Sequence, residues 1–95
     1  MKTELTTECR QKLKRQIQYI SLDKPIAAKR FNKLVFSEIK KIKEVPFKNK
    51  KSKFFDDENI RELIIKGYSI IYEVNKSENM IVVFGFHKWE DSLNL

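Results

Sequence analysis

The stretch "IRELIIKGYSIIYEV", residues 60–74, consists of two apolar runs separated by a Lys-Gly pair. The runs, 60–65 and 68–74, are rich in β-branched and aromatic side chains, which favour strands. Gly67 permits the positive φ that a two-residue hairpin turn requires. A third run of the same kind, "MIVVFGF" (80–86), follows a short polar connection. The three runs predict antiparallel strands joined by hairpins.

In the second and third runs apolar residues occur at both odd and even positions, and so on both faces of the predicted strands. In the second run one face carries Tyr68, Ile70, Tyr72 and Val74, and the other carries Ile71 with Ser69 and Glu73. In the third run one face carries Met80, Val82, Phe84 and Phe86, and the other carries Ile81 and Val83 with Gly85 and His87. In a sheet with one solvated face, apolar and polar residues alternate more regularly along each strand. We therefore expect helices on one face, and on the second face a cover that a partner protein can supply.

Two helical segments precede the strands. The first begins after the candidate N-cap Thr7, and its apolar positions recur at helical spacing: Cys9, Leu13, Ile17 and Ile20. Pro25 suits the first position of a second helix. That helix should run to about Lys43 on the apolar positions Ala27, Phe31, Leu34, Val35, Ile39 and Ile42. Two helices joined by so few residues pack as an antiparallel hairpin.

The remaining segments complete the predicted fold. "KTELT" (2–6) alternates briefly, as a short strand does, and the lysine-rich stretch 46–59 reads as a loop with some strand character at Phe54–Phe55. The fold class is α+β, an N-terminal helical hairpin packed on one face of a small antiparallel β-sheet. We expect residues 1–95 to form a single domain.

Charge is distributed unevenly along the chain, whose formal net charge is +7. Residues 1–55 carry 16 Lys or Arg against 5 Asp or Glu, and residues 56–95 carry 4 against 8. A lopsided basic chain favours a polyanionic or acidic partner, although a solvated basic surface is the alternative. The single cysteine, Cys9, excludes an intrachain disulfide and is expected to be buried and inert. With no signal peptide or membrane-spanning stretch in the sequence, we expect a soluble cytoplasmic protein without membrane contact.

Three pieces of the chain together resemble the ParE/RelE superfamily of toxins. "YISLDKPIAAKRFNKL" (19–34) resembles the turn between the two family helices. "IRELIIKGYSIIYEV" (60–74) resembles the family hairpin, and "MIVVFGFHKWED" (80–91) resembles its last strand and the segment that follows. The resemblance, nearer the ParE branch, implies a toxin of a type II toxin–antitoxin module. Its expected partner is a cognate antitoxin protein in a toxin–antitoxin hetero-oligomer.

The resemblance leaves the target open between two branches. ParE-like toxins inhibit DNA gyrase, whereas RelE-like toxins cleave messenger RNA on the ribosome without a metal ion. The strict RelE set of basic residues and C-terminal tyrosine is absent, because Ser69 follows Tyr68 and Glu62 stands where a lysine is expected. We therefore favour gyrase inhibition. A ribosome-dependent endonuclease is the alternative, and a non-toxic nucleic-acid-binding module of the same fold is a third reading.

His87 and Arg61 are the candidate catalytic residues if the chain is a nuclease. An imidazole titrates near neutral pH and can act as acid or base, while a guanidinium can stabilise a phosphate. For both residues a structural role is the competing interpretation, with Arg61 pairing to Glu73 or Asp91. The candidate contacts to target or nucleic acid are Lys48, Lys50, Lys51, Lys53, Lys88 and Trp89. The alternatives are a solvated loop that meets an acidic antitoxin and, for Trp89, anchoring on the sheet. No metal site and no cofactor are predicted.

Overall fold

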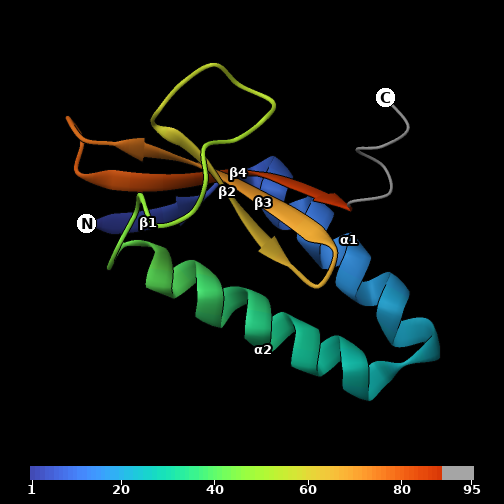
Figure 1. Ribbon diagram of the computed structural model, residues 1–95. Coiled ribbons are helices and arrows are strands. Elements are labelled where there is room, and N and C mark those ends of the chain that lie inside the picture. The colour runs from blue at the N-terminus through green and yellow to red at the C-terminus, as the bar shows by residue number, and fades with distance from the viewer. Residues whose placement is uncertain (89–95) are drawn as a thin grey trace.

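A computed structural model describes residues 1–88 as two helices packed on one face of a four-stranded sheet (Figure 1). The elements, in chain order, are β1 (Lys2–Leu5), α1 (Thr7–Asp23), α2 (Pro25–Ile42), β2 (Ile60–Ile65), β3 (Tyr68–Asn75) and β4 (Met80–Lys88). The strand order across the sheet is β1-β4-β3-β2. The predicted α+β architecture is confirmed. We call the side of the sheet that packs on the helices the helix face, and the other side the far face.

The short N-terminal strand joins the sheet in an orientation that the sequence did not reveal. β1 pairs in parallel with β4, from Lys2 opposite Met80 to Leu5 opposite Val83. The sheet is therefore mixed, and the expectation of antiparallel pairing throughout is wrong at this edge. Parallel neighbours need a long crossover connection, and the helices and the first hairpin supply it.

The helical hairpin follows the predicted boundaries closely. The α1 N-cap is Thr6, one residue earlier than predicted, because its hydroxyl accepts a hydrogen bond from the Cys9 backbone N–H at 3.2 Å. A single residue, Lys24, separates the helices, and its N–H donates to Ile20 O at 2.8 Å. Pro25 occupies the first turn of α2, as predicted.

The β2–β3 turn has the geometry that its sequence requires. Lys66 has φ 51° and Gly67 has φ 82°, so both central residues are in the left-handed region, as in a type I′ turn. This turn sets the register in which Ile65 lies opposite Tyr68 and Arg61 lies opposite Tyr72.

A β-bulge in β4 changes the predicted pattern of buried residues. Ile71 lies opposite Gly85 and Tyr72 lies opposite Val83, so Phe84 is the extra residue. Before the bulge Ile81 and Val83, each 0% exposed, occupy the helix face, and after it Phe86 does. The expected grouping of Met80, Val82 and Phe84 with Phe86 is therefore wrong. A Cβ at Gly85 would lie 3.0 Å from Ile71 Cβ, so the close approach of the paired strands β3 and β4 favours glycine here.

The 46–59 loop wraps around the edge of β2 and covers part of the far face. At the edge, Ser52 N–H donates to Ile60 O at 2.8 Å and Glu62 N–H donates to Lys50 O at 2.9 Å. On the far face, the centroid of the Phe54 ring lies 5.9 Å from that of the His87 ring, and the centroid of the Phe55 ring lies 5.5 Å from that of the Phe84 ring. Part of the cover on this face therefore comes from the chain itself. The isolated β-bridge in the loop joins Lys51 to Arg61, so the strand character predicted at Phe54–Phe55 is misplaced.

Tyr72 fixes the start of this loop from the helix face. Its hydroxyl, on a ring that is 0% exposed, donates to Pro46 O at 2.6 Å and accepts from Asn49 Nδ2 at 3.1 Å. Burial raises the pKa of this hydroxyl, so it remains a protonated donor to a higher pH than an exposed tyrosine would. Tyr68 is also a core residue, as predicted, and its hydroxyl accepts from Gln16 Nε2 at 2.8 Å.

Removing the Tyr72 hydroxyl should weaken the attachment of the loop. We expect Tyr72→Phe to lower the free energy of unfolding by about 1–2 kcal/mol, because two hydrogen bonds are lost and the Pro46 carbonyl loses its donor. Urea denaturation followed by circular dichroism measures the change. Tyr19→Phe is the matched control, because Tyr19 is 68% exposed. Equal stability of the two variants would contradict the anchoring role.

Candidate functional site

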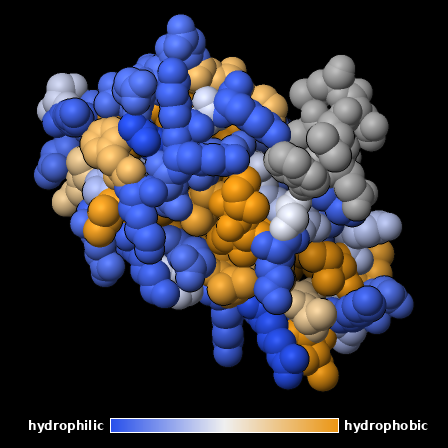
Figure 2. Space-filling model, in the orientation of Figure 1, coloured by the Kyte–Doolittle hydropathy of each residue, from blue (hydrophilic) through white to orange (hydrophobic). Residues whose placement is uncertain are grey.

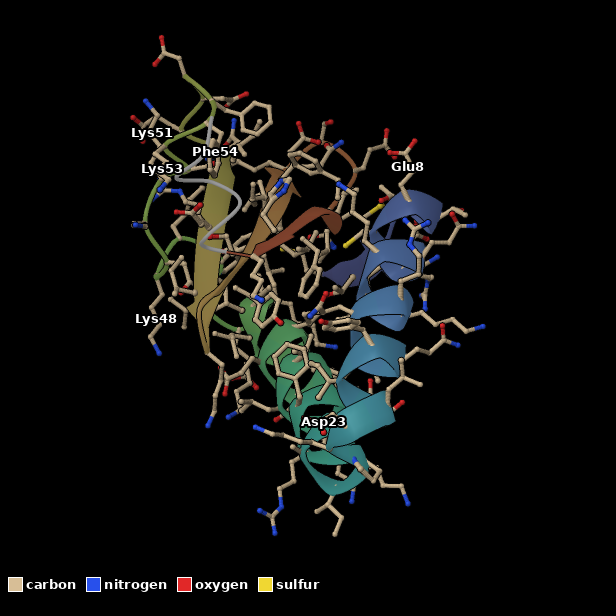
Figure 3. The ribbon with its side chains drawn as sticks, turned by 90° about the vertical axis from the view of Figure 1, so that its right-hand side faces the viewer. Glu8, Asp23, Lys48, Lys51, Lys53 and Phe54 are labelled. Atoms are coloured by element: carbon tan, nitrogen blue, oxygen red, sulfur yellow. The ribbon has the colours of Figure 1, made fainter. Side chains whose placement is uncertain are left out.

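The loop lysines predicted to bind a target lie on the far side of the molecule from α1. Figure 3 shows Lys48, Lys51 and Lys53 on the loop beside β2, across the sheet from that helix. Lys51 Nζ lies 3.1 Å from Asp56 Oδ1 and 3.8 Å from Glu58 Oε1. The hydrogen bond to Asp56 is the main cause that raises the pKa of Lys51. The positive charge of Lys51 is therefore partly neutralised by acidic side chains of the same loop.

Lys50 pairs with a carboxylate that is fully buried. Its Nζ lies 3.4 Å from Glu62 Oε2, and the Glu62 side chain is 0% exposed. Within residues 1–88 neither Glu62 oxygen accepts a hydrogen bond. A buried carboxylate is costly without a counter-charge. Lys50 thus holds the loop over the far face as well as bearing a surface charge.

The two other loop lysines are exposed at the surface. Lys48 is exposed, and its side chain projects away from the loop (Figure 3). Lys53 Nζ lies 5.2 Å from the centroid of the Phe54 ring, within the range of a cation–π interaction.

Arg61 is bound into the loop by its own guanidinium group. Nε donates to Glu58 O at 2.9 Å, Nη1 donates to Asn49 O at 3.2 Å, and Nη2 lies 3.3 Å from Glu58 Oε2. The group also lies over the Phe47 ring, 4.9 Å from its centroid. The structural role that we weighed is present, but the acidic partner is Glu58 instead of Glu73; Asp91 lies outside the described residues.

His87 lies on the opposite face of the sheet from Arg61. It pairs across the strands with Ser69, which in turn pairs with Ile64. Ile64 is three residues from Arg61 on β2, so their side chains point to opposite faces. The two candidates are also separated by about 10 Å along the strands and by the width of β3. The fold does not bring them together around one phosphate.

The last two predicted contacts lie at the end of β4. Lys88 pairs with Tyr68 in the sheet register. Trp89 lies outside the described residues.

Two hollows lie on the helical side, and the second of them is lined in part by the predicted site residues His87 and Lys88. One is a groove of about 720 Å³ at the tip of the helical hairpin, which we call the hairpin-tip groove; its apolar lining includes Ile20, Pro25, Ile26, Phe31 and Leu34. Figure 2 shows hydrophobic residues at this end of the molecule among hydrophilic ones. The other, of about 460 Å³, lies between α1 and the end of β4; we call it the α1–β4 cleft. The signal for this cleft was the helical spacing of Lys12, Arg15 and Tyr19.

Neither a membrane span nor a metal cluster is found in the part of the chain that the structure describes. No helix there is long and apolar enough to cross a membrane. Residues 1–88 also contain no group of three or more His, Cys, Asp or Glu side chains arranged to hold a metal ion.

The helical hairpin, the β2–β3 hairpin and the last strand match one protein family over nearly the whole described chain. Residues 3–88 match the family described as "ParE toxin of type II toxin-antitoxin system, parDE". The chain belongs to the ParE toxin family. Among curated proteins, none matches it at a significant level. Membership in the ParE family confirms the resemblance and makes the chain the toxin component of a type II module, which implies a cognate antitoxin.

Loss of the charge that faces Glu62 should destabilise this ParE-family protein. We expect Lys50→Ala to lower the free energy of unfolding by about 1 kcal/mol, because it leaves the Glu62 carboxylate buried without a cation, although the exposure of Lys50 limits the effect. Thermal denaturation at pH 7 measures it. Lys48→Ala, which removes an exposed lysine from the same loop, should change stability by less than about 0.5 kcal/mol. If both variants unfold like the parent, the ion pair does not hold the loop.

Proposed function

We propose that this ParE-family toxin stops growth by binding DNA gyrase and inhibiting it. The placement of Arg61 and His87 on opposite faces of the sheet carries this proposal. Metal-free RNA cleavage needs a base, a proton donor and a phosphate-stabilising cation within reach of one scissile phosphate. The two residues named for these roles, Arg61 and His87, do not meet at one phosphate, which supports inhibition by binding over cleavage by this pair.

The chemistry of the loop supports the same proposal. The N–H groups of Arg61 donate hydrogen bonds to Asn49 and Glu58, and Lys51 is paired with acidic side chains. A cation that is already hydrogen-bonded must give up those bonds before it can stabilise a phosphate. The loop is therefore better suited to maintaining the shape of a binding surface than to phosphoryl chemistry.

We propose that the cognate antitoxin docks in the hairpin-tip groove. Ile26 is 68% exposed in this groove, and the lining includes the cations Lys24, Arg30 and Lys66 but no acidic residue from the described part of the chain. An apolar floor with a basic rim complements an amphipathic helix whose polar side is acidic.

Expression under tight control tests the proposed target. We expect plasmid supercoiling to fall while messenger RNA stays intact, and purified protein to inhibit the supercoiling reaction of purified gyrase. Because His87 has no catalytic part in this proposal, His87→Ala should keep its toxicity. New RNA ends at codon-defined positions, or loss of toxicity in a folded His87→Ala variant, would instead support the ribosome-dependent endonuclease.

A charged side chain in the groove should release the antitoxin without abolishing toxicity. We expect Ile26→Glu, co-expressed with the cognate antitoxin, to weaken neutralisation by about tenfold or more, because a carboxylate enters an apolar contact beside an acidic partner. Growth and co-purification measure this effect. Leu22→Glu is the control, because Leu22 is 86% exposed and does not line the groove. Retained neutralisation of Ile26→Glu would place the antitoxin elsewhere.

A further inference from the structure

The α1–β4 cleft combines cations from a helix with a floor of aromatic rings. Lys12, Arg15 and Tyr19 follow one another at spacings of three and four, so they form one stripe on α1. The floor consists of Tyr68 and Phe86, whose rings stack with centroids 5.1 Å apart and planes inclined by 10°. The hydrogen bond from Gln16 to the Tyr68 hydroxyl ties this floor to the helix at 2.8 Å.

The described residues that line the cleft carry charge of one sign. Within residues 1–88 none of the lining side chains is acidic. The acidic residues of α1 lie near its two ends, at Glu8 and Asp23 (Figure 3). Lys12 and Arg15 are exposed, and neither forms an ion pair with another residue in the range 1–88. Lys12 and Arg15 therefore offer the cleft two cations that form no ion pair within residues 1–88, although Glu8 lies one helical turn before Lys12.

Tyr19 adds an aromatic surface beside these cations. Its ring is 68% exposed, whereas Tyr68 and Tyr72 are buried. An exposed ring beside a cationic groove is the arrangement on which proteins stack the bases of single-stranded nucleic acids. The cleft volume of about 460 Å³ lies in the range of small-ligand sites, roughly 300–1,000 Å³.

We propose that the α1–β4 cleft binds a nucleotide unit, with its phosphate on Lys12 and Arg15 and its base stacked on Tyr19. The ligand is either a free nucleotide or one unit of a single strand, since both present the same phosphate and base. A duplex presents phosphates but keeps its bases stacked inside, and an acidic peptide lacks a base. This site is separate from the loop lysines and does not depend on gyrase inhibition.

Fluorescence anisotropy of a labelled single-stranded oligouridylate with the purified chain tests the proposal. Lys12→Gln with Arg15→Gln should weaken binding by about tenfold or more and reduce the slope of log affinity against log salt by about 1.4, as expected for two lost phosphate contacts on a single strand. The matched control is Arg10→Gln with Lys14→Gln, which removes the same charge from the same helix outside the cleft. An equal loss in the two variants would overturn the proposal, because binding would then follow net charge alone.

Replacement of the ring tests the stacking contact. Tyr19→Leu should weaken binding of the oligouridylate by about tenfold, which is in the range of one lost stacked base, and should leave the salt slope unchanged. Circular dichroism checks that each variant is folded. An unchanged affinity of Tyr19→Leu, or polyglutamate competing as well as the oligouridylate, would overturn the proposal.

Competition identifies the source of the nucleotide unit. Displacement by uridine monophosphate, but not by uridine or inorganic phosphate, supports a free nucleotide as ligand. Displacement by unlabelled oligouridylate alone supports a strand. Equal competition by inorganic phosphate would overturn the role of the base. The assay contains no gyrase, so its outcome is independent of the supercoiling test.

Discussion

The hydroxyl of Tyr72 is the contact on which the arrangement of the far side of the molecule depends. It lies in the core on the helix face, yet it binds Pro46 and Asn49 at the start of the 46–59 loop. From this anchor the loop passes the edge of β2 and places Lys50 over the buried Glu62. The loop also supplies backbone partners to the first residues of β2. An edge strand that is paired in this way is less open to pairing with other chains.

The cations of the 46–59 loop differ from those of α1 in whether carboxylates lie beside them. On the loop, cations meet carboxylates at short range, so that Lys51 and Arg61 stabilise the shape of the loop. On α1, Lys12 and Arg15 of the α1–β4 cleft form no ion pair with a described carboxylate. The distinction depends on where carboxylates lie in space and not on the local density of lysine. The lysine-richest stretch of the sequence is therefore not the part of the surface with the least compensated charge.

The sequence was sufficient to predict the helices and strands whose buried residues recur at a regular spacing. The α1 and α2 boundaries and the three C-terminal strands follow from apolar spacing, from Pro25 and from the Lys66–Gly67 turn. The parallel pairing of β1, the bulge at Phe84 and the cover by Phe54 and Phe55 depend on contacts between distant segments, which local patterns do not specify. The candidate site shared this limit. His87 and Arg61 were identifiable as residue types, but register alone decides which face each one occupies.

The pairing of β1 with β4 affects how the toxin matures during synthesis. Lys2 and Met80 are neighbours in the sheet although nearly the whole chain separates them. Such non-local pairing slows folding, because loop closure costs entropy before any contact is gained. The central position of β4 means that the sheet cannot close until this last strand has left the ribosome. A nascent chain therefore lacks the finished sheet until β4 has been synthesised, even though β1 is available from the start.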